Sequence, residues 1–456
     1  HPYLKAPHCG STMARAMARA AATASPSALL LLGMFAASAA APGELMLPDI
    51  STLSLDSIYL LPLAGEKCGE GNPMYYGIVT PSAINTTTKV WVESMGGAIC
   101  FDEHSCADKE FNVWLDLLKI VKRYVPSSAV PGGSVDALYA LLTSGLPIPL
   151  SMFRELEVSY FPNGAGGALE GEVGFFFPSC TGDAGLGNHE VTYRGDQVTH
   201  HSGGASYMLL MRAVQQARPD LERMTLIGAS GSAVSRVAWA STAADMFPTA
   251  EVRVVADSAM HVLPGTEVFK YFWSEVQWSP NPGGRHDLAQ LYAPGMVSLP
   301  TFDWRSLSAI SDMLRQYAGR VKLLYIACNN DEVVKGDRNS LSAYANFTAP
   351  TSVEEEMWDF IQRLVRDAPA GSAFSYISQG TCHHQTRNGF VPAINASDSS
   401  DPGPKRFTEA FLKGEPLDTA HVWCCGKAPP EPAAMEETSS AASMARSLVA
   451  SAVAAV

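Results

Sequence analysis

A serine set in a turn of small residues is the side chain of this sequence best suited to nucleophilic chemistry. Ser230 follows the apolar run 224–227 and precedes a segment in which Ala, Val and Trp recur at helical spacing. In a nucleophile elbow, a strained serine between a strand and a helix needs small neighbours, and the helix N terminus stabilises negative charge. Those neighbours are Gly228, Ala229, Gly231 and Ser232. Ser232 replaces the last glycine of the G-x-S-x-G pattern, and an ordinary capped turn is the alternative interpretation.

An acidic side chain follows a later strand. In hydrolases that use a nucleophile elbow, the catalytic residues occur along the chain in the order Ser, Asp, His. Residues 322–327 form the best later strand candidate, and Asp331 stands in the loop after them. Asp257, directly after the candidate strand 252–256, is the rival, although an Asp in such a place more often caps a turn. We therefore expect Asp331 to be the acid.

Two adjacent histidines complete the order. His383 and His384 follow a short strand-like run and a glycine. We expect His383 to be the general base and keep His384 as the alternate, because the sequence does not tell which ring faces the serine. A metal-binding pair is the other interpretation, to which His200 and His201 can add ligands. Because a catalytic zinc site needs about three close protein ligands and no H-E-x-x-H motif is present, we expect no metal and no cofactor.

A glycine-rich loop lies upstream of the serine. Residues 90–93 are predicted to form a strand, and Gly96, Gly97 and Ala98 follow it. Small residues let backbone N–H groups approach a carbonyl oxygen, which is the requirement for an oxyanion donor in the loop after such a strand.

The elements that must position these residues follow a βα pattern. Short apolar runs rich in β-branched and aromatic residues alternate with amphipathic stretches, which predicts an α/β fold with a mostly parallel central sheet flanked by helices. The candidate strands are 89–92, 174–177, 224–227, 252–256 and 322–327, and the candidate helices are 108–124, 205–217, 232–246 and 352–366. Pro-rich segments at 125–149 and 277–300 are interpreted as insertions over the sheet edge.

Composition divides the chain into four parts. Residues 1–12 are interpreted as an upstream, non-native segment, and residues 13–41 as a signal peptide with two arginines, a short apolar stretch and small residues. Residues 42–427 are expected to form one domain that holds all the candidate catalytic residues. Residues 428–456, rich in Ala, Ser, Pro and Glu, are expected to be a low-complexity tail without stable order.

Charge and cysteines indicate a secreted protein. The net charge of −13 argues against nucleic acid or an anionic membrane as partner. No apolar segment reaches the length of about 20 residues that a membrane-spanning helix needs, so we expect no stable membrane insertion. Apart from Cys9, eight cysteines remain, which predicts several disulfides in an oxidising compartment. Sequons at Asn85, Asn346 and Asn395 fit that compartment. We expect an extracellular monomer.

Several motifs in order resemble the pectin acetylesterase and Notum family of secreted carboxylesterases. The resemblance spans about residues 62–384. It is carried by the segments C-G-E-G-N-P-M-Y-Y from Cys68, G-G-A-I-C from Gly96 with Cys106 after it, C-T-G-D from Cys180 with Gly187 and Asn188, G-A-S from Gly228, D-S at Asp257, and the regions of Asp331 and His383.

The resemblance implies an α/β-hydrolase-like serine esterase with disulfide-stabilised insertions and no metal. It implies an oxyanion hole made by the N–H groups of Gly97, Ala98 and Gly231, while Gly96 and Gly228 support the loop and the elbow. Asp183 looks like support for the site, and a capped turn beside Cys180 is its more plausible role.

The implied substrate is an acylated polysaccharide or an acylated protein. We expect hydrolysis of an acetyl ester on a polysaccharide, as in the pectin-type members of the family. The alternatives are removal of a fatty acyl group from a protein, as in the Notum-type members, or an inactive hydrolase fold that serves as a binding module. The altered elbow is the best support for the last alternative.

Overall fold

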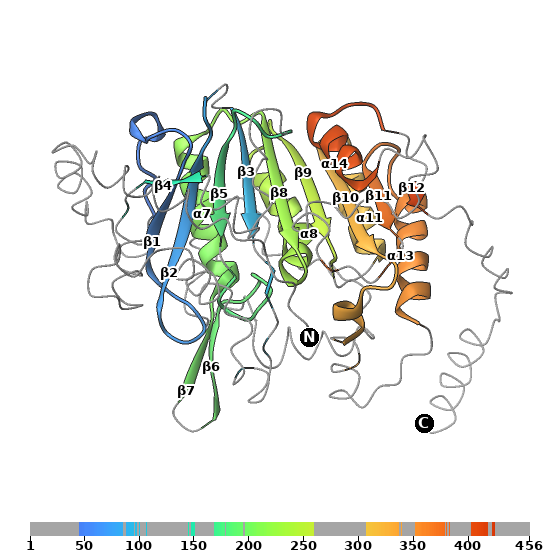
Figure 1. Ribbon diagram of the computed structural model, residues 1–456, viewed down its shortest axis with the longest axis horizontal. Helices are drawn as coiled ribbons and strands as arrows, with labels where there is room; N and C mark the ends of the chain where they lie inside the picture. Colours follow the sequence, from blue (N-terminus) through green and yellow to red (C-terminus); the bar gives the residue numbers. More distant parts are fainter. Residues whose placement is uncertain are drawn as a thin grey trace, which may run out of the picture.

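A ten-stranded sheet forms the centre of the molecule in the computed structural model (Figure 1). The structure describes residues 45–84, 88–94, 96–97, 100, 106, 145, 147–150, 168–177, 179–194, 197–259, 307–336, 339, 352–378, 380, 383, 403–417 and 422–424. The strand order is β12-β11-β10-β9-β8-β3-β5-β2-β1-β4. The strands are β1 (Ser57–Lys67), β2 (Pro73–Thr80), β3 (Lys89–Ser94), β4 (Ile148–Pro149), β5 (Val173–Phe177), β8 (Arg223–Ala229), β9 (Glu251–Asp257), β10 (Val321–Cys328), β11 (Ala373–Ser378) and β12 (Val422–Cys424).

The sheet is mostly parallel, which confirms the predicted fold class. From β12 to β5 every neighbouring pair is parallel, whereas β2 runs antiparallel to both β1 and β5, and β4 runs antiparallel to β1. Parallel strands are covered on both faces and therefore consist of continuous apolar runs. In β8 all seven residues are buried.

Helices flank this sheet. They are α7 (Gly203–Ala217), α8 (Gly231–Met246), α11 (Leu307–Gln316), α13 (Val353–Asp367) and α14 (Gly403–Lys413), with a 3-10 turn at Ile50–Thr52. The helix α8 packs on β8 and β9, and α14 contacts β10 and β11. No helix in the described part of the chain is both long and apolar enough to cross a bilayer.

The predicted elements agree closely with these bounds wherever the structure describes them. All five predicted strands are present, as are the helices predicted at 205–217, 232–246 and 352–366. The helix predicted at 108–124 lies outside the described residues, as do most of both Pro-rich segments. The sequence did not predict β1, β2, α11, α14 or the separate hairpin β6 (His189–Arg194) and β7 (Gln197–His201), which extends beyond the lower edge of the sheet in Figure 1.

Disulfides confirm the expected use of cysteine. Cys68, just after β1, is bonded to Cys180, which follows β5, and Cys100 is bonded to Cys106. Cys328 at the end of β10 is disulfide-bonded as well.

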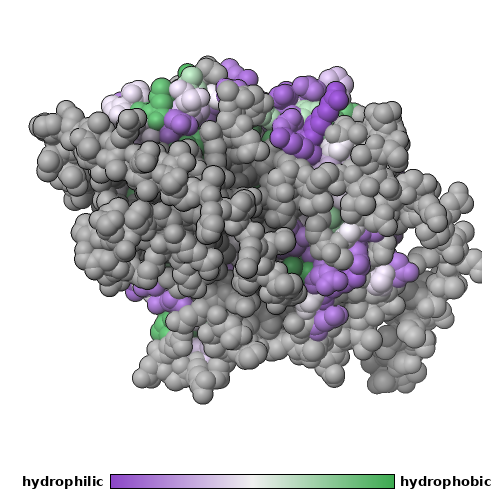
Figure 2. Space-filling view, in the orientation of Figure 1, coloured by the Kyte–Doolittle hydropathy of each residue, from purple (hydrophilic) through white to green (hydrophobic). Residues whose placement is uncertain are grey.

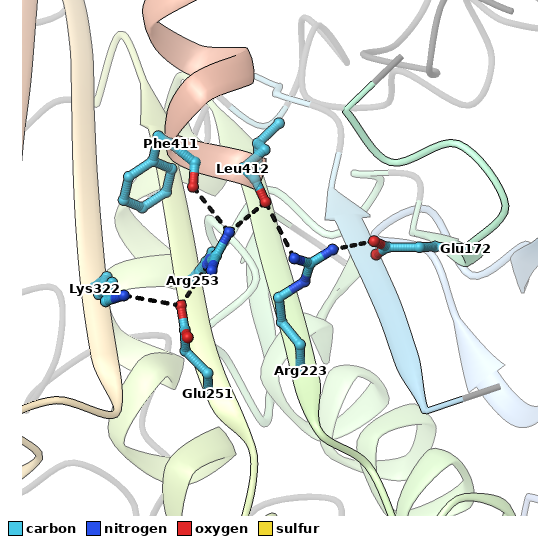
Figure 3. Close-up of polar contacts among 7 residues, drawn as sticks. All are labelled: Glu172, Arg223, Glu251, Arg253, Lys322, Phe411 and Leu412. Atoms are coloured by element: carbon cyan, nitrogen blue, oxygen red, sulfur yellow. Dashed lines mark hydrogen bonds and ion pairs between the residues drawn. The ribbon is translucent and has the colours of Figure 1, made fainter. Parts of the chain in front are cut away.

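A network of charged residues at the amino ends of the strands holds α14. We call it the amino-edge cluster, and it comprises Glu172, Arg223, Glu251, Arg253 and Lys322 together with the carbonyl groups of Phe411 and Leu412 (Figure 3). Arg223 pairs with Glu172 and donates to the Leu412 carbonyl at 3.2 Å. Arg253 donates to the carbonyl of Phe411 at 2.9 Å and also to the carbonyl of Leu412. These cations satisfy carbonyl groups that the last turn of a helix leaves without partners.

The helix α14 is amphipathic, and its polar face is exposed. Phe407, Phe411 and Leu412 are buried, whereas Lys405 and Arg406 are exposed. Figure 2 shows hydrophilic residues over this helix at the top of the molecule. The apolar face therefore docks α14 on the sheet while the amino-edge cluster fixes its C-terminal end.

Candidate active site

The backbone at Ser230 has the strained conformation of a nucleophile elbow. Ser230 connects β8 to α8 with φ 55° and ψ −130°, a region that non-glycine residues avoid at a cost of about 1–3 kcal/mol. Its N–H group donates to the carbonyl of Asp257 at 2.8 Å, and the residue is buried, with 6% exposure. The structure therefore has the strand, turn and helix that the sequence predicted around this serine.

Gly228 allows the elbow to close. A Cβ atom at this position would lie 2.6 Å from the carbonyl oxygen of Ser232 and 2.7 Å from Cα of Ala233. These are backbone atoms of the first turn of α8, so a side chain would push the helix away from the strand. The predicted supporting role of Gly228 therefore has a steric cause.

Asp331 and His383 lie in direct contact. Nδ1 of His383 is 2.7 Å from Oδ2 of Asp331, whose carboxyl group is buried. The other carboxyl oxygen accepts N–H groups from Val333 at 3.0 Å and Val334 at 3.1 Å, which fixes the orientation of the carboxylate. A carboxylate at Nδ1 favours the tautomer with the proton on that nitrogen and leaves the Nε2 lone pair to accept a proton.

Backbone contacts between two loops bring this pair together. The N–H group of Asn329 donates to the Ser378 carbonyl at 2.9 Å, and that of Asn330 donates to the Gly380 carbonyl at 3.0 Å. The side chain of Asn329 accepts the N–H group of Gly380 at 3.0 Å. The loops after β10 and β11 are thus joined just before Asp331 and His383, and sequence reasoning missed this role of Asn329.

The three candidate residues follow parallel strands of the same sheet. Ser230 comes directly after β8, Asp331 after β10 and His383 after β11, and the carboxyl ends of parallel strands share one edge. That edge is the lower one in Figure 1. Loops at this edge are the usual place for a site in an open α/β sheet.

The rival acid, Asp257, has different contacts. It is the last residue of β9 and is fully buried, its carboxyl group accepts the Ser258 hydroxyl at 3.1 Å, and its carbonyl accepts the N–H group of Ser230. These contacts support the turn at Ser230, whereas Asp331 contacts the ring of His383. The geometry favours Asp331 as the partner of the base.

The predicted oxyanion loop is described in part. Gly96 is buried and Gly97 is half-buried after the end of β3, which lies beside β8 in the sheet, and Gly231 is the first residue of α8. The N–H groups of the first helical turn have no partner within the helix. Ala98 and the alternate base His384 lie outside the described residues. The roles of the three N–H groups remain predictions.

Asp183 is a structural centre next to Gly182, whose carbonyl accepts the N–H group of Cys100 at 2.7 Å. Its buried carboxylate accepts N–H groups from Gly185, Gly187 and Gly203 at 2.8, 3.1 and 2.7 Å, and the Thr181 hydroxyl at 2.7 Å. A Cβ at Gly187 or Gly203 would lie within 2.5 Å of this carboxylate. The carboxylate thus joins the N terminus of α7 to the segment after Cys180, in agreement with the capped-turn interpretation.

The histidines of the hairpin are used in hydrogen bonds. Nδ1 of His201 lies 2.9 Å from the Thr181 carbonyl, and Nε2 lies 2.9 Å from the Tyr193 hydroxyl. Burial lowers the pKa of His201 to about 4, which keeps the ring neutral at pH 7. His200 Nδ1 lies 2.8 Å from a carboxyl oxygen of Glu190.

A ring nitrogen of His201 also lies close to two sulfur atoms. The potential ligand atoms of His201, Cys100 and Cys106 are within 4.8 Å of one another, and no other group of three such residues occurs in the described ranges. Both sulfurs are engaged in the Cys100–Cys106 disulfide. Because a thiolate is the metal-binding form of cysteine, the group does not fit a resident metal ion.

A buried guanidinium lies beside the elbow, with no carboxylate partner among the residues that the structure describes. Arg236 in α8 is fully buried, and its Cζ lies 3.8 Å from the ring centroid of Tyr207. One Nη donates to the Ser235 hydroxyl at 3.2 Å, and the other has no hydrogen-bond partner in the described part of the chain. Burial lowers the pKa of the guanidinium, although an arginine stays charged at neutral pH.

Comparison with known proteins gives distant structural likeness only. No family model matches the chain. No curated protein matches it either. Among solved structures, the Wnt deacylase Notum from Drosophila is similar over 81% of this chain and 97% of that chain, with a TM-score of 0.45 and 14% sequence identity. Because a likeness this weak carries no function, any assignment of activity depends on the geometry of the site.

Proposed function

We propose that this chain is a serine hydrolase of carboxylic esters, with Ser230 as nucleophile, His383 as general base and Asp331 as the acid that orients the base. The observation that carries the proposal is the 2.7 Å contact between His383 Nδ1 and Asp331 Oδ2 at the sheet edge that holds the strained turn of Ser230. An imidazole oriented by a buried carboxylate is the arrangement that activates a serine for acyl transfer.

The proposed reaction passes through an acyl-enzyme. His383 takes the proton of the Ser230 hydroxyl as Oγ attacks the ester carbonyl carbon. The N–H groups of Gly97, Ala98 and Gly231 donate to the oxygen on which negative charge develops. His383 then gives the proton to the departing alcohol, and water, activated by the same ring, releases the carboxylic acid from Ser230.

The proposed substrate is an acetyl ester on an extracellular polysaccharide. Support comes from the order of sequence motifs that resemble the pectin acetylesterase and Notum family. The disulfides Cys68–Cys180 and Cys100–Cys106 support an oxidising compartment, where such a substrate is found. The Notum-type alternative is a fatty acyl group on a protein, and chain-length preference separates the two.

The test is hydrolysis of p-nitrophenyl acetate, butyrate and octanoate by the full chain made in an oxidising host. Wild type is compared with Ser230→Ala and with Ser311→Ala, a control that removes a buried hydroxyl from α11. We expect Ser230→Ala to lose about 10⁴-fold or more in kcat/KM and Ser311→Ala to stay within about threefold of wild type.

Acyl preference then tests the substrate class. A preference for acetate, together with release of acetate from acetylated pectin, would support the polysaccharide substrate. A preference for octanoate and turnover of a fatty-acylated peptide would replace it with the protein substrate. A folded wild type without any turnover would contradict the hydrolase proposal and favour an inactive binding module.

A further inference from the structure

The residue that departs from the usual elbow pattern makes a buried connection across the site. Ser232 has 3% exposure, and its hydroxyl oxygen accepts the N–H group of Ala229 at 3.0 Å. The same oxygen lies 2.8 Å from the carbonyl oxygen of Ser94 and 2.8 Å from that of Ala229, to either of which it can donate its proton. Ser94 is the last residue of β3 and stands two residues before Gly96.

This hydroxyl continues the pairing of two strands beyond the point where their backbones pair. The register of β3 and β8 ends at Ser94 and Gly228. At the next residue, Ala229, the N–H group is met by the Ser232 hydroxyl, which also reaches the Ser94 carbonyl. A side chain therefore supplies the rung that would join Ala229 to Ser94, whereas a glycine at position 232 has no group to do so.

We propose that Ser232 positions the oxyanion hole by fixing the nucleophile elbow against the end of β3. The inference rests on the proposed ester hydrolysis. Gly231 immediately precedes Ser232 in the chain, and Gly97 lies three residues after Ser94, so the rung joins the two backbone segments that carry the oxyanion donors. Misplacement of such donors by about 1 Å can cost on the order of 10²-fold in rate.

The test compares Ser232→Ala with the control Ser311→Ala. Ser311 is also buried, in α11, and its hydroxyl has no hydrogen-bond partner among the residues that the structure describes. We expect Ser232→Ala to lower kcat for p-nitrophenyl acetate about tenfold with KM within about twofold of wild type. Its affinity for an aryl boronic acid, which forms a tetrahedral adduct on the serine, should weaken by a similar factor, while Ser311→Ala changes neither.

A merely structural role gives a different pattern. If Ser232→Ala lowers Tm but leaves kcat and boronic acid affinity at 25 °C as in wild type, the proposal is overturned. Ser232→Thr keeps the hydroxyl and should retain kcat within about threefold. If Ser232→Ala does not fold, Ser232→Cys takes its place, because a thiol fills the space but is a weak donor and acceptor. Its kcat should also fall about tenfold, and an unchanged kcat would contradict the inference.

Failure of this inference is distinguishable from failure of the proposed function. In the first case the wild type is active, Ser230→Ala abolishes the activity, and Ser232→Ala leaves it unchanged. The second is seen as a folded wild type with no esterase activity at all.

Discussion

The two edges of the central sheet differ in the partners of their arginines and in backbone strain. At the amino edge, Arg223 and Arg253 each combine a carboxylate partner with helix carbonyls of α14. At the carboxyl edge, Arg236 has a hydroxyl and an aromatic ring but no carboxylate partner within the described ranges, and Ser230 has a strained backbone. The amino edge holds ion pairs that stabilise the fold. The carboxyl edge holds backbone strain at Ser230, where we place the chemistry.

This contrast assigns different consequences to mutation at each edge. Loss of a pair at the amino edge should lower the free energy of unfolding and leave turnover unchanged in the folded molecules. Loss of a group at the carboxyl edge should lower turnover more than stability. Two substitutions test this division, and a third tests how the stability of the folded chain depends on pH. They follow in order of expected effect.

Asp331→Asn should give the largest change. An amide cannot hold His383 in the tautomer that the reaction needs, so we expect kcat for p-nitrophenyl acetate to fall about 10³- to 10⁴-fold. Asp257→Asn is the control, with an expected loss of less than about tenfold, because its carboxyl group contacts Ser258. The opposite ranking of the two variants would transfer the role of acid to Asp257.

Arg223→Met should affect stability alone. It leaves the Glu172 carboxylate, with 5% side-chain exposure, without its main partner, and breaking a buried pair costs about 3–5 kcal/mol. Denaturant unfolding should show this loss, while kcat at 25 °C stays as in wild type. Arg315→Met is the control, because the pair of Arg315 with Asp312 is exposed and worth at most about 1 kcal/mol. Equal effects of the two variants would refute a stabilising role for the amino-edge cluster.

His201→Gln should change the pH dependence of stability. Burial lowers the pKa of His201 to about 4 in the folded chain, from 6.5, so the unfolded chain binds more protons between these values. The contribution of the neutral His201 ring to the free energy of unfolding is therefore present above about pH 6.5. It is lost as pH falls toward 4, by about 3 kcal/mol at most. Glutamine can keep both hydrogen bonds but does not titrate.

Unfolding of wild type and His201→Gln should therefore be compared at pH 7 and pH 4.5. We expect the wild type to lose more stability than the variant on acidification. Equal losses in the two proteins would show that His201 does not contribute to this dependence.

The sequence predicted those parts of the molecule that local pattern determines. The strands β8, β9 and β10 are mostly apolar, and the turn at Ser230 follows from its small neighbours. Pro62 and Gly65 interrupt the apolar pattern of β1, so the sequence did not indicate the antiparallel strands at this end of the sheet. Arg223 and Arg253 act through contacts with a helix more than 150 residues later in the chain, at separations of 189 and 158, and no local pattern indicates such contacts.

The same limit applies within the site. The order of Ser230, Asp331 and His383 could be predicted because each follows a strand. The loop contacts of Asn329 and the rung made by Ser232 depend on which strands become neighbours in space. In the sequence Ser232 is only a departure from a pattern, and its contacts with Ser94 and Ala229 give it a physical role.

Covalent labelling of the folded chain with a fluorophosphonate tests the central claim most directly. Peptide mass spectrometry should find the phosphonyl group on Ser230 in the wild type, with labelling strongly reduced in His383→Ala. Ser232, Ser235 and Ser258 lie nearby in the sequence and serve as internal controls. A folded chain that remains unlabelled, or that carries the label on another serine, would contradict the assignment of Ser230 as the nucleophile.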